Sequence, residues 1–351
     1  LDAGLFLTGD VDGDGREELY VVSKYGLKRL FQVSFDGADY DLVELGTISE
    51  STIAAFLVGD GDNDGRDEIY VGSWTELFQF DWTESGWEQH SIGLPSQCLW
   101  DVTLGDPEND GNNALYMTGD SYDYDSVYRI AWNGSAWQSE EAFTCWDLYA
   151  DGHSTSGDAR SASVAGEGTR RETDSAHRSR NAWIRLTDIV IGDLEGDGTE
   201  DLYVLLLDGD ILGTYGYEYG KVSRAEWTHQ GWTFEPALWL LSSEYWTAYS
   251  GSAPLPPRSG RLRREVPGTP NHSLHMVAFE GHDSLVGRHY DQYCVSGECE
   301  TSSGIRRYYY AEGEYASETI HDFGETESNP HGVRMLRRGI LNGQDESFFA
   351  I

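Results

Sequence analysis

The chain has 351 residues, of which 61 are acidic and 24 are basic, so its formal net charge is −37. A protein with this charge repels nucleic acids and anionic lipid surfaces, which argues against both as partners. No run of about 18 apolar residues occurs, so we expect no membrane insertion.

A unit of about 45 to 50 residues recurs along the chain, as in propeller blades, and residues 51–96 show it most clearly. The unit opens with the short apolar run Ile53–Val58, which is typical of a buried inner strand. An acidic, glycine-rich loop follows, and then come three more strand-like segments, Glu68–Gly72, Glu76–Trp82 and Trp87–Ile92. Four antiparallel strands of this length make one propeller blade, so the repetition predicts an all-β fold, a β-propeller of six or seven four-stranded blades.

Further along the chain the units become less regular. Residues 150–182 have no apolar period and are rich in Ser, Gly, Arg and Asp, which predicts a surface insertion; a badly eroded blade is the alternative. The last unit is partial, so we expect either that the molecule continues past Ile351 or that a partner chain closes the ring. The predicted blades of this single domain are approximately 1–50, 51–96, 97–149, 183–245, 246–325 and, in part, 326–351.

Four loops carry carboxylates at alternate positions. Ca²⁺ takes six to eight oxygen ligands, and a short loop of this pattern supplies them; Mg²⁺ prefers a tight octahedron with retained waters and is less well suited. A glycine at position 6 allows the sharp turn, the residue at position 7 offers its backbone carbonyl, and an acid at position 9 closes the site. The predicted ligands of the three complete loops are Asp10, Asp12, Asp14, Arg16 and Glu18; Asp60, Asp62, Asp64, Arg66 and Glu68; and Asp193, Glu195, Asp197, Thr199 and Asp201.

The remaining loop lacks one carboxylate. It keeps Asp106, Glu108 and Asp110, but Ala114 stands at position 9. We therefore expect three calcium sites and a fourth, weaker one. Solvated acidic hairpin tips are the alternative, but full copies at blade-like spacing favour metal binding. EF-hand loops begin similarly, yet they need an acid at position 12, where these complete loops have a valine inside a predicted strand.

The motif from Gly9 to Val21, Gly-Asp-Val-Asp-Gly-Asp-Gly-Arg-Glu-Glu-Leu-Tyr-Val, resembles the FG-GAP/VCBS-type repeat of integrin α-subunit propellers and many secreted microbial proteins. The resemblance extends over about 1–145 and 183–241. It implies a secreted or cell-surface propeller with Ca²⁺ in the loop between the first two strands of a blade. It implies no single activity, because adhesins, lectin-like modules and polysaccharide lyases share this repeat.

Three functions are open on these observations. The first is a non-catalytic extracellular module that binds carbohydrate or protein on a cell surface or in the extracellular matrix. The second is a subunit of a self-assembling surface layer. The third is a polysaccharide lyase or hydrolase on a propeller scaffold. Histidines in the irregular fifth unit are the only basis for catalysis, because no other catalytic motif is present. These histidines are His275, His282, His289 and His321.

The cysteines and the glycosylation sequons bear on the compartment. Cys98 and Cys145 both precede a Trp-Asp pair, so they are candidates for equivalent places in neighbouring repeats and for a disulfide. Cys294 and Cys299 flank a turn-like stretch, which favours a local hairpin disulfide; free buried thiols are the alternative for all four. Sequons make Asn133 and Asn271 candidate glycosylation sites in a secreted protein.

Tryptophans recur in pairs at equal spacing within the units. We expect them to pack across strands or between blades, and stacking on sugar rings is the alternative. The pairs are Trp82 with Trp87, Trp132 with Trp137, and Trp227 with Trp232.

Overall fold

The computed structural model describes most of the chain, and all structural statements refer to this part. The described residues are 3–23, 27–35, 39–48, 53–96, 98–121, 124–152, 182–210, 218–239, 274–279, 282–295, 298–311, 313–322, 336–341 and 344–350.

These residues form six antiparallel sheets, and five of them have four strands in simple chain order. The first two sheets contain β1 (Ala3–Gly9), β2 (Glu18–Ser23), β3 (Lys28–Phe35) and β4 (Tyr40–Ile48), then β5 (Ile53–Gly59), β6 (Glu68–Ser73), β7 (Leu77–Thr83) and β8 (Gly86–Ser91). The next two contain β9 (Cys98–Gly105), β10 (Ala114–Ser121), β11 (Tyr124–Trp132) and β12 (Trp137–Thr144), then β13 (Ala182–Gly192), β14 (Asp201–Asp210), β15 (Glu218–Thr228) and β16 (Gly231–Trp239). The last two contain β17 (Leu274–Phe279), β18 (His282–Val295), β19 (Glu298–Ala311) and β20 (Glu314–Asp322), then β21 (Leu336–Leu341) and β22 (Gln344–Ala350).

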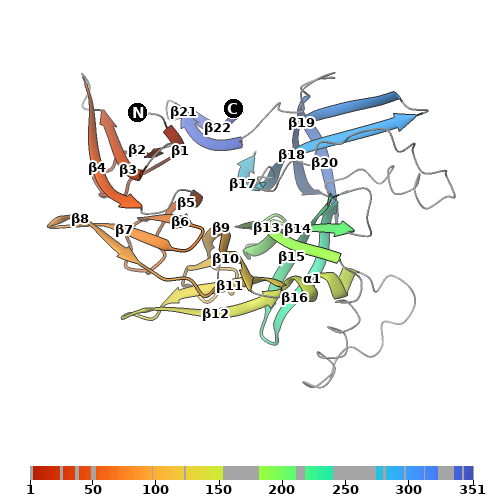
Figure 1. Ribbon diagram of the computed structural model, residues 1–351, viewed down its shortest axis with the longest axis horizontal. Coiled ribbons are helices and arrows are strands. Elements are labelled where there is room, and N and C mark those ends of the chain that lie inside the picture. Colours follow the sequence, from red (N-terminus) through yellow and green to blue (C-terminus); the bar gives the residue numbers. More distant parts are fainter. Residues whose placement is uncertain are drawn as a thin grey trace.

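The sheets stand in a ring, with the first strand of each toward the middle (Figure 1). The first strands contact one another in succession from β1 through β5, β9, β13 and β17 to β21, and β21 in turn contacts β1. The two chain ends accordingly lie close together at this junction. This arrangement is a β-propeller of four-stranded antiparallel blades, as predicted, and its sixth sheet has two described strands.

The core consists of apolar layers between neighbouring blades. One layer joins Tyr20 and Leu30 of the first blade to Ile69 and Phe80 of the second, and all four side chains are buried. A similar layer lies between each of the next three pairs of blades. Both faces of a sheet are therefore covered, which explains why the inner strands read as nearly continuous apolar runs.

The glycines that precede the first three acidic loops leave little room for a side chain. A Cβ atom on Gly59 would lie 2.5 Å from Leu104 Cδ2 of the next blade, and one on Gly9 would lie 2.9 Å from Val58 Cγ1. Gly105 has the same relation to Ile191, at 2.7 Å. Real Cβ atoms essentially never come this close, so the glycine of the Gly-Asp pair at the start of the motif reflects blade packing.

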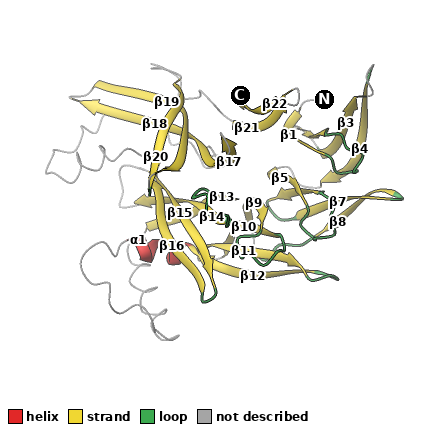
Figure 2. Cartoon of the chain, turned by 180° about the vertical axis from the view of Figure 1, so that it is seen from behind, coloured by secondary structure: helices red, strands yellow, loops and turns green. Residues whose placement is uncertain are grey.

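The only helix among the described elements is α1 (Cys145–Gly152), which lies beside β16 at the periphery (Figure 2). Its start is capped, because the Thr144 N–H and hydroxyl both donate to Asp147 Oδ2 at 2.8 Å. The Trp-Asp pair at 146–147 is therefore a helix start. The rest of the predicted insertion, 153–181, lies outside the described residues. No described helix is long and apolar enough to cross a membrane.

The predicted disulfide between Cys98 and Cys145 is wrong. The two thiols are not joined. Cys98 begins the innermost strand of the third blade, whereas Cys145 follows the outermost strand of the same blade. Three strand spacings of about 4.8 Å separate these edges, which is too far for a disulfide. The two Trp-Asp pairs are thus not equivalent positions of neighbouring repeats.

Candidate metal centres

Four loops connect the first and second strands of the first four blades, and they share one conformation. We number them loop 1 (10–18), loop 2 (60–68), loop 3 (106–114) and loop 4 (193–201). In each, the position 1 aspartate accepts a hydrogen bond through Oδ2 from the N–H of the position 6 glycine, at 2.7 to 3.0 Å. The position 5 aspartate accepts through Oδ1 from the position 7 N–H, at 2.9 Å in all four loops.

The backbone of each loop passes through the left-handed region twice. Position 6 is glycine with φ between 85° and 89°. Position 4 is glycine in loops 1 and 4 and asparagine in loops 2 and 3, where Asn63 has φ 61° and Asn109 has φ 52°. Glycine and asparagine are the residues that adopt this region most readily. The sequence alternation of acid with Gly or Asn therefore has a backbone cause.

Loops 1 and 2 bring carboxylates together, and no described basic side chain forms an ion pair with them. In loop 2, one oxygen each of Asp60, Asp62, Asp64 and Glu68 lie within 4.8 Å of one another. In loop 1 the corresponding group consists of Asp10, Asp12 and Glu18. No other such group occurs among the described residues, and none of their ion pairs involves a carboxylate of these two loops.

Two further observations fit a hard divalent cation. Asp10 Oδ1 is buried and has no hydrogen-bond partner, so one ligand oxygen at position 1 is unsatisfied. The position 9 carboxylates are almost fully buried, Glu18 at 5% exposure and Glu68 at 3%. Burial raises the pKa of Glu68 to about 8, with the Asp62 charge adding to the effect. Burial and the charges of Asp12 and Asp14 raise the pKa of Glu18 to about 7. Without a cation these carboxylates repel one another, and a bound Ca²⁺ would relieve this.

In loops 3 and 4 an arginine already lies against the carboxylates. Arg129 Nε is 2.9 Å from Glu108 Oε1 in loop 3. Arg224 Nε is 2.7 Å from Asp201 Oδ2 and 3.6 Å from Glu195 Oε1 in loop 4. The two loop 4 acids that contact Arg224 are largely buried, with side-chain exposures of 2% for Asp201 and 10% for Glu195.

These arginines occupy one structural position, which the sequence analysis missed. Each loop is followed by a buried tyrosine on the second strand, and the residue opposite that tyrosine on the third strand faces the loop. It is Gln32 in the first blade and Gln79 in the second, then Arg129 and Arg224. The distance from the tyrosine varies because the connecting hairpins differ in length. A constant signal exists, however: each residue stands three places before an aromatic residue at the last or second-to-last position of the third strand, namely Phe35, Trp82, Trp132 or Trp227.

Position 8 of a loop reaches back to the preceding loop. Glu200 Oε2 accepts from the N–H of Asp106, position 1 of loop 3, at 2.8 Å. Asn113 Nδ2 donates to the carbonyl of Asp60, position 1 of loop 2, at 2.9 Å, and its own N–H donates to Asn63 Oδ1 at 2.7 Å. Burial and the charges of Asp60 and Asp10 raise the pKa of Asp67. The loops therefore form a connected series along one rim.

The tryptophan pairs pack across strands, as expected. The two rings of each pair lie on opposite strands with centroids 5.2 to 5.6 Å apart. The second ring also packs edge-on against the loop tyrosine of the preceding blade, as with Trp137 on Tyr70 at 6.1 Å and Trp232 on Tyr116 at 6.1 Å. The aromatic residues thus join neighbouring blades beside the acidic loops.

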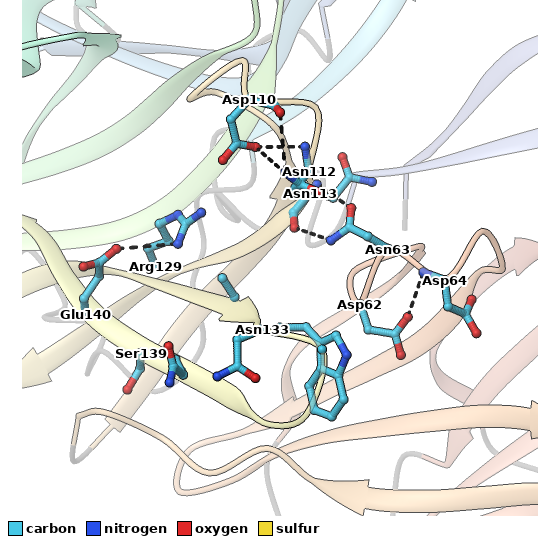
Figure 3. Close-up of a pocket in the computed structure, with 14 residues that line it drawn as sticks. Asp62, Asn63, Asp64, Asp110, Asn112, Asn113, Arg129, Asn133, Ser139 and Glu140 are labelled. Carbon is cyan, nitrogen blue, oxygen red and sulfur yellow. Dashed lines mark hydrogen bonds and ion pairs between the residues drawn. The ribbon is translucent and has the colours of Figure 1, made fainter.

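A polar groove of about 1030 Å³ lies between loops 2 and 3 and the outer hairpin of the third blade (Figure 3). One of its walls carries the sequon residue Asn133, whose Oδ1 accepts from the N–H groups of Ser135 and Ala136 at 3.0 Å. The other candidate glycosylation site, Asn271, lies outside the described residues. The polar lining residues are Asp62, Asn63, Asp64, Asp110, Asn112, Asn113, Arg129, Asn133, Gln138, Ser139 and Glu140, and Trp132 is also in the lining.

The histidines of the fifth blade are spread over its sheet. His282 begins β18, and His289 stands seven residues further on the same strand, about 23 Å away at 3.3 Å per residue. His275 pairs with Val286 on the innermost strand, and His321 pairs with Ile305 on the outer one. The strand register therefore does not gather all four at one point. Cys294 stands opposite Cys299 in the register, so a hairpin disulfide there stays a prediction, since their side chains lie outside the description.

Comparison with known proteins adds little to this picture. No protein-family model matches the sequence, and no curated protein does. Among solved structures, the WD40 domain of SCAP from fission yeast is similar over 86% of this chain, with 12% sequence identity and a TM-score of 0.35. The chain spans 59% of the length of that structure. The assignment of the fold therefore rests on the sheets and their ring contacts.

Proposed function

We propose that the protein is an extracellular calcium-stabilised β-propeller of the FG-GAP/VCBS type that acts as a non-catalytic binding, adhesion or surface-assembly module. One observation supports the metal above all others: the carboxylates of loops 1 and 2 converge, and no described lysine or arginine forms an ion pair with them. Ca²⁺ suits these loops because it accepts many oxygen ligands in a flexible geometry. Extracellular modules bind it at roughly 0.1 to 1 mM, a range that fits an exposed rim in a secreted protein.

Calcium titration tests this proposal directly. Isothermal titration of the chelator-treated protein with CaCl₂ should give two bound ions. Glu68→Gln, which removes the charge of the closing ligand in loop 2, should leave one ion and keep the folded circular dichroism spectrum. Arg66→Gln changes a side chain whose position is expected to contribute only its backbone carbonyl, and it should leave two. Absence of calcium binding by the wild-type protein at millimolar concentrations would refute the metal proposal.

The polar groove is the surface that best fits a ligand. Carboxylate and amide groups from two loops face a hairpin wall with one tryptophan, Trp132. This combination of hydrogen-bonding groups and an aromatic ring suits a carbohydrate, whose hydroxyls need many partners and whose ring faces are apolar. Asp62 and Asp64 belong both to the groove and to loop 2, so calcium in that loop would also hold the groove in shape.

A blocking substitution separates this surface from the rest of the rim. Ser139 is exposed on the groove wall, and Ser139→Tyr would fill part of the space without disturbing the core. In a glycan array with calcium, we expect the wild type to bind one glycan class and Ser139→Tyr to lose at least about tenfold in affinity, or about 1.4 kcal/mol. Ser91→Tyr, exposed on β8 outside the groove, is the matched control. Equal binding by both variants would exclude the groove.

A further inference from the structure

The third-strand residue opposite the loop tyrosine differs in charge between the first two blades and the next two. It is a buried glutamine in the blades of loops 1 and 2, where carboxylates converge and no described arginine or lysine pairs with them. It is an arginine in direct contact with the acids of loops 3 and 4. We propose that this residue selects the cation of each loop: glutamine leaves the loop to a calcium ion, and arginine supplies an internal guanidinium that takes the place of the ion. This inference rests on the proposed calcium sites of loops 1 and 2.

Loop 4 gives the strongest support. It has all four acids of the calcium motif, yet two of them already form ion pairs with an arginine. The guanidinium of Arg224 contacts both the position 3 and the position 9 acids, Glu195 and Asp201. Glu195 Oε2 accepts from the Tyr203 hydroxyl at 2.6 Å, and its Oε1 accepts from the Tyr315 hydroxyl of the next blade. Both Glu195 oxygens therefore already have donors within the protein. An ion would have to displace the guanidinium of Arg224 from these two acids and leave it only the exposed partners Glu226 and Glu235, at 3.6 and 4.0 Å, which is costly.

Loop 3 shows the same device with one acid fewer. Position 9 is the buried Ala114, so only three acids remain at the alternate positions. Arg129 neutralises Glu108 through Nε and also lies 3.5 Å from Glu140 through Nη1. The missing carboxylate and the added guanidinium change the loop charge in the same direction. Together they weaken the attraction for a divalent cation, which is proportional to the net negative charge of the loop.

Loop 2 shows what the glutamine does instead. Gln79 Nε2 donates to Asp62 Oδ2 at 3.3 Å, and its Oε1 accepts from Trp137 Nε1 at 3.0 Å. The amide thus orients a ligand of loop 2 and links it to the next blade, but it has no charge to offset the carboxylates. We expect an arginine here to reach the position 3 and position 9 acids of loop 2, Asp62 and Glu68, as Arg224 reaches the corresponding acids of loop 4.

The loops with an arginine and the loops with a glutamine differ in their need for calcium. Arginine stays protonated at every pH at which proteins fold, so loops 3 and 4 keep their cation in the absence of calcium. Loops 1 and 2 depend on the ion supplied from solution. We therefore expect two bound calcium ions, in loops 1 and 2, where the sequence predicts three and a weaker fourth.

Exchange of the selecting residue tests the inference by counting ions. In calorimetric titration we expect two ions for the wild type, three for Arg224→Gln and one for Gln79→Arg. Arg29→Gln removes the same charge from an exposed ion pair with Glu44 and should leave two. Asp201→Asn added to Arg224→Gln should remove the gained ion, which locates it in loop 4. Circular dichroism in 5 mM calcium checks that each variant is folded.

The possible outcomes separate this inference from the proposed function. Two ions in both the wild type and Arg224→Gln would overturn the selecting role and leave the calcium sites of loops 1 and 2 intact. Three ions in the wild type would also overturn it. No ions in the wild type would refute the proposed metal function itself. If Arg224→Gln does not fold, Gln79→Arg decides alone, because loss of one ion supports the inference and retention of both contradicts it.

Discussion

Removal of calcium should lower the melting temperature of the protein by on the order of 10 °C. A site filled at 100 times its dissociation constant stabilises the folded state by about 2.7 kcal/mol. Two such sites give about 5 kcal/mol, and each kcal/mol corresponds to roughly 2 to 4 °C in domains of 150 to 250 residues. Differential scanning calorimetry in 10 mM CaCl₂, about 100 times a dissociation constant of roughly 0.1 mM, and in excess EDTA measures the difference.

The effect of EDTA should grow as the pH rises from 5 to 8. In the cation-free fold, the pKa of Glu68 is raised to about 8 from an ordinary value of 4.5. The native carboxyl therefore keeps its proton in this range while the unfolded chain loses it, so stability falls with increasing pH. Bound calcium removes this penalty, because the ion compensates the carboxylate charge. Glu68→Gln should show a weaker pH dependence in EDTA, and it serves as the control.

One result would contradict stabilisation by calcium. An unchanged melting curve in excess EDTA at pH 8 would mean that loops 1 and 2 are solvated turns, the alternative that the sequence left open. Magnesium at the same concentration should restore less stability than calcium, since it demands a tight octahedral geometry.

The fold was predictable because its signals are local and repeated. Loop glycines, alternating strands and hairpin turns recur in four blades, so an error in one repeat is corrected by the others. The helix cap formed by Thr144 and Asp147 shows where this reasoning failed. The Trp-Asp pair beside Cys145 looked like part of the repeat, but it starts a helix, and the predicted disulfide was lost with that interpretation.

The acidic loops were also predictable, but the charges opposite them were not. Arg129 and Arg224 face their loops across a strand pairing, and their separation in sequence from the loop depends on hairpin length. A sequence pattern with fixed spacing cannot detect such a partner. Counting backward from the aromatic residue at the end of the third strand would have found it. The sequence predicted equal calcium sites in loops 2 and 4, although an uncharged glutamine contacts an acid of loop 2 and an arginine contacts the acids of loop 4.

The second large effect concerns Trp137, which joins the second and third blades. Its ring lies 5.6 Å from Trp132 and packs edge-on against Tyr70 at 6.1 Å, while its Nε1 donates to Gln79 Oε1 at 3.0 Å. Trp137→Ala removes all three contacts and leaves the buried Gln79 without this donor. We expect a loss of about 3 to 5 kcal/mol in the free energy of unfolding, as for large-to-small changes of buried aromatic residues.

Urea denaturation in the presence of calcium measures this loss, and Trp82→Ala is the matched control. Trp82 belongs to the tryptophan pair of the second blade, with Trp87 as its partner. It is 38% exposed and lies next to the turn of its hairpin. Its removal should cost about 1 kcal/mol, the value of an aromatic pair with little burial. Trp137→Phe keeps the packing and loses only the bond to Gln79, so it should cost about 1 to 3 kcal/mol. Equal losses for Trp137→Ala and Trp82→Ala would show that the aromatic pairs act within blades alone. A larger loss for Trp137→Ala, together with weaker calcium binding at loop 2, would show that blade packing and the metal loop are coupled through Gln79.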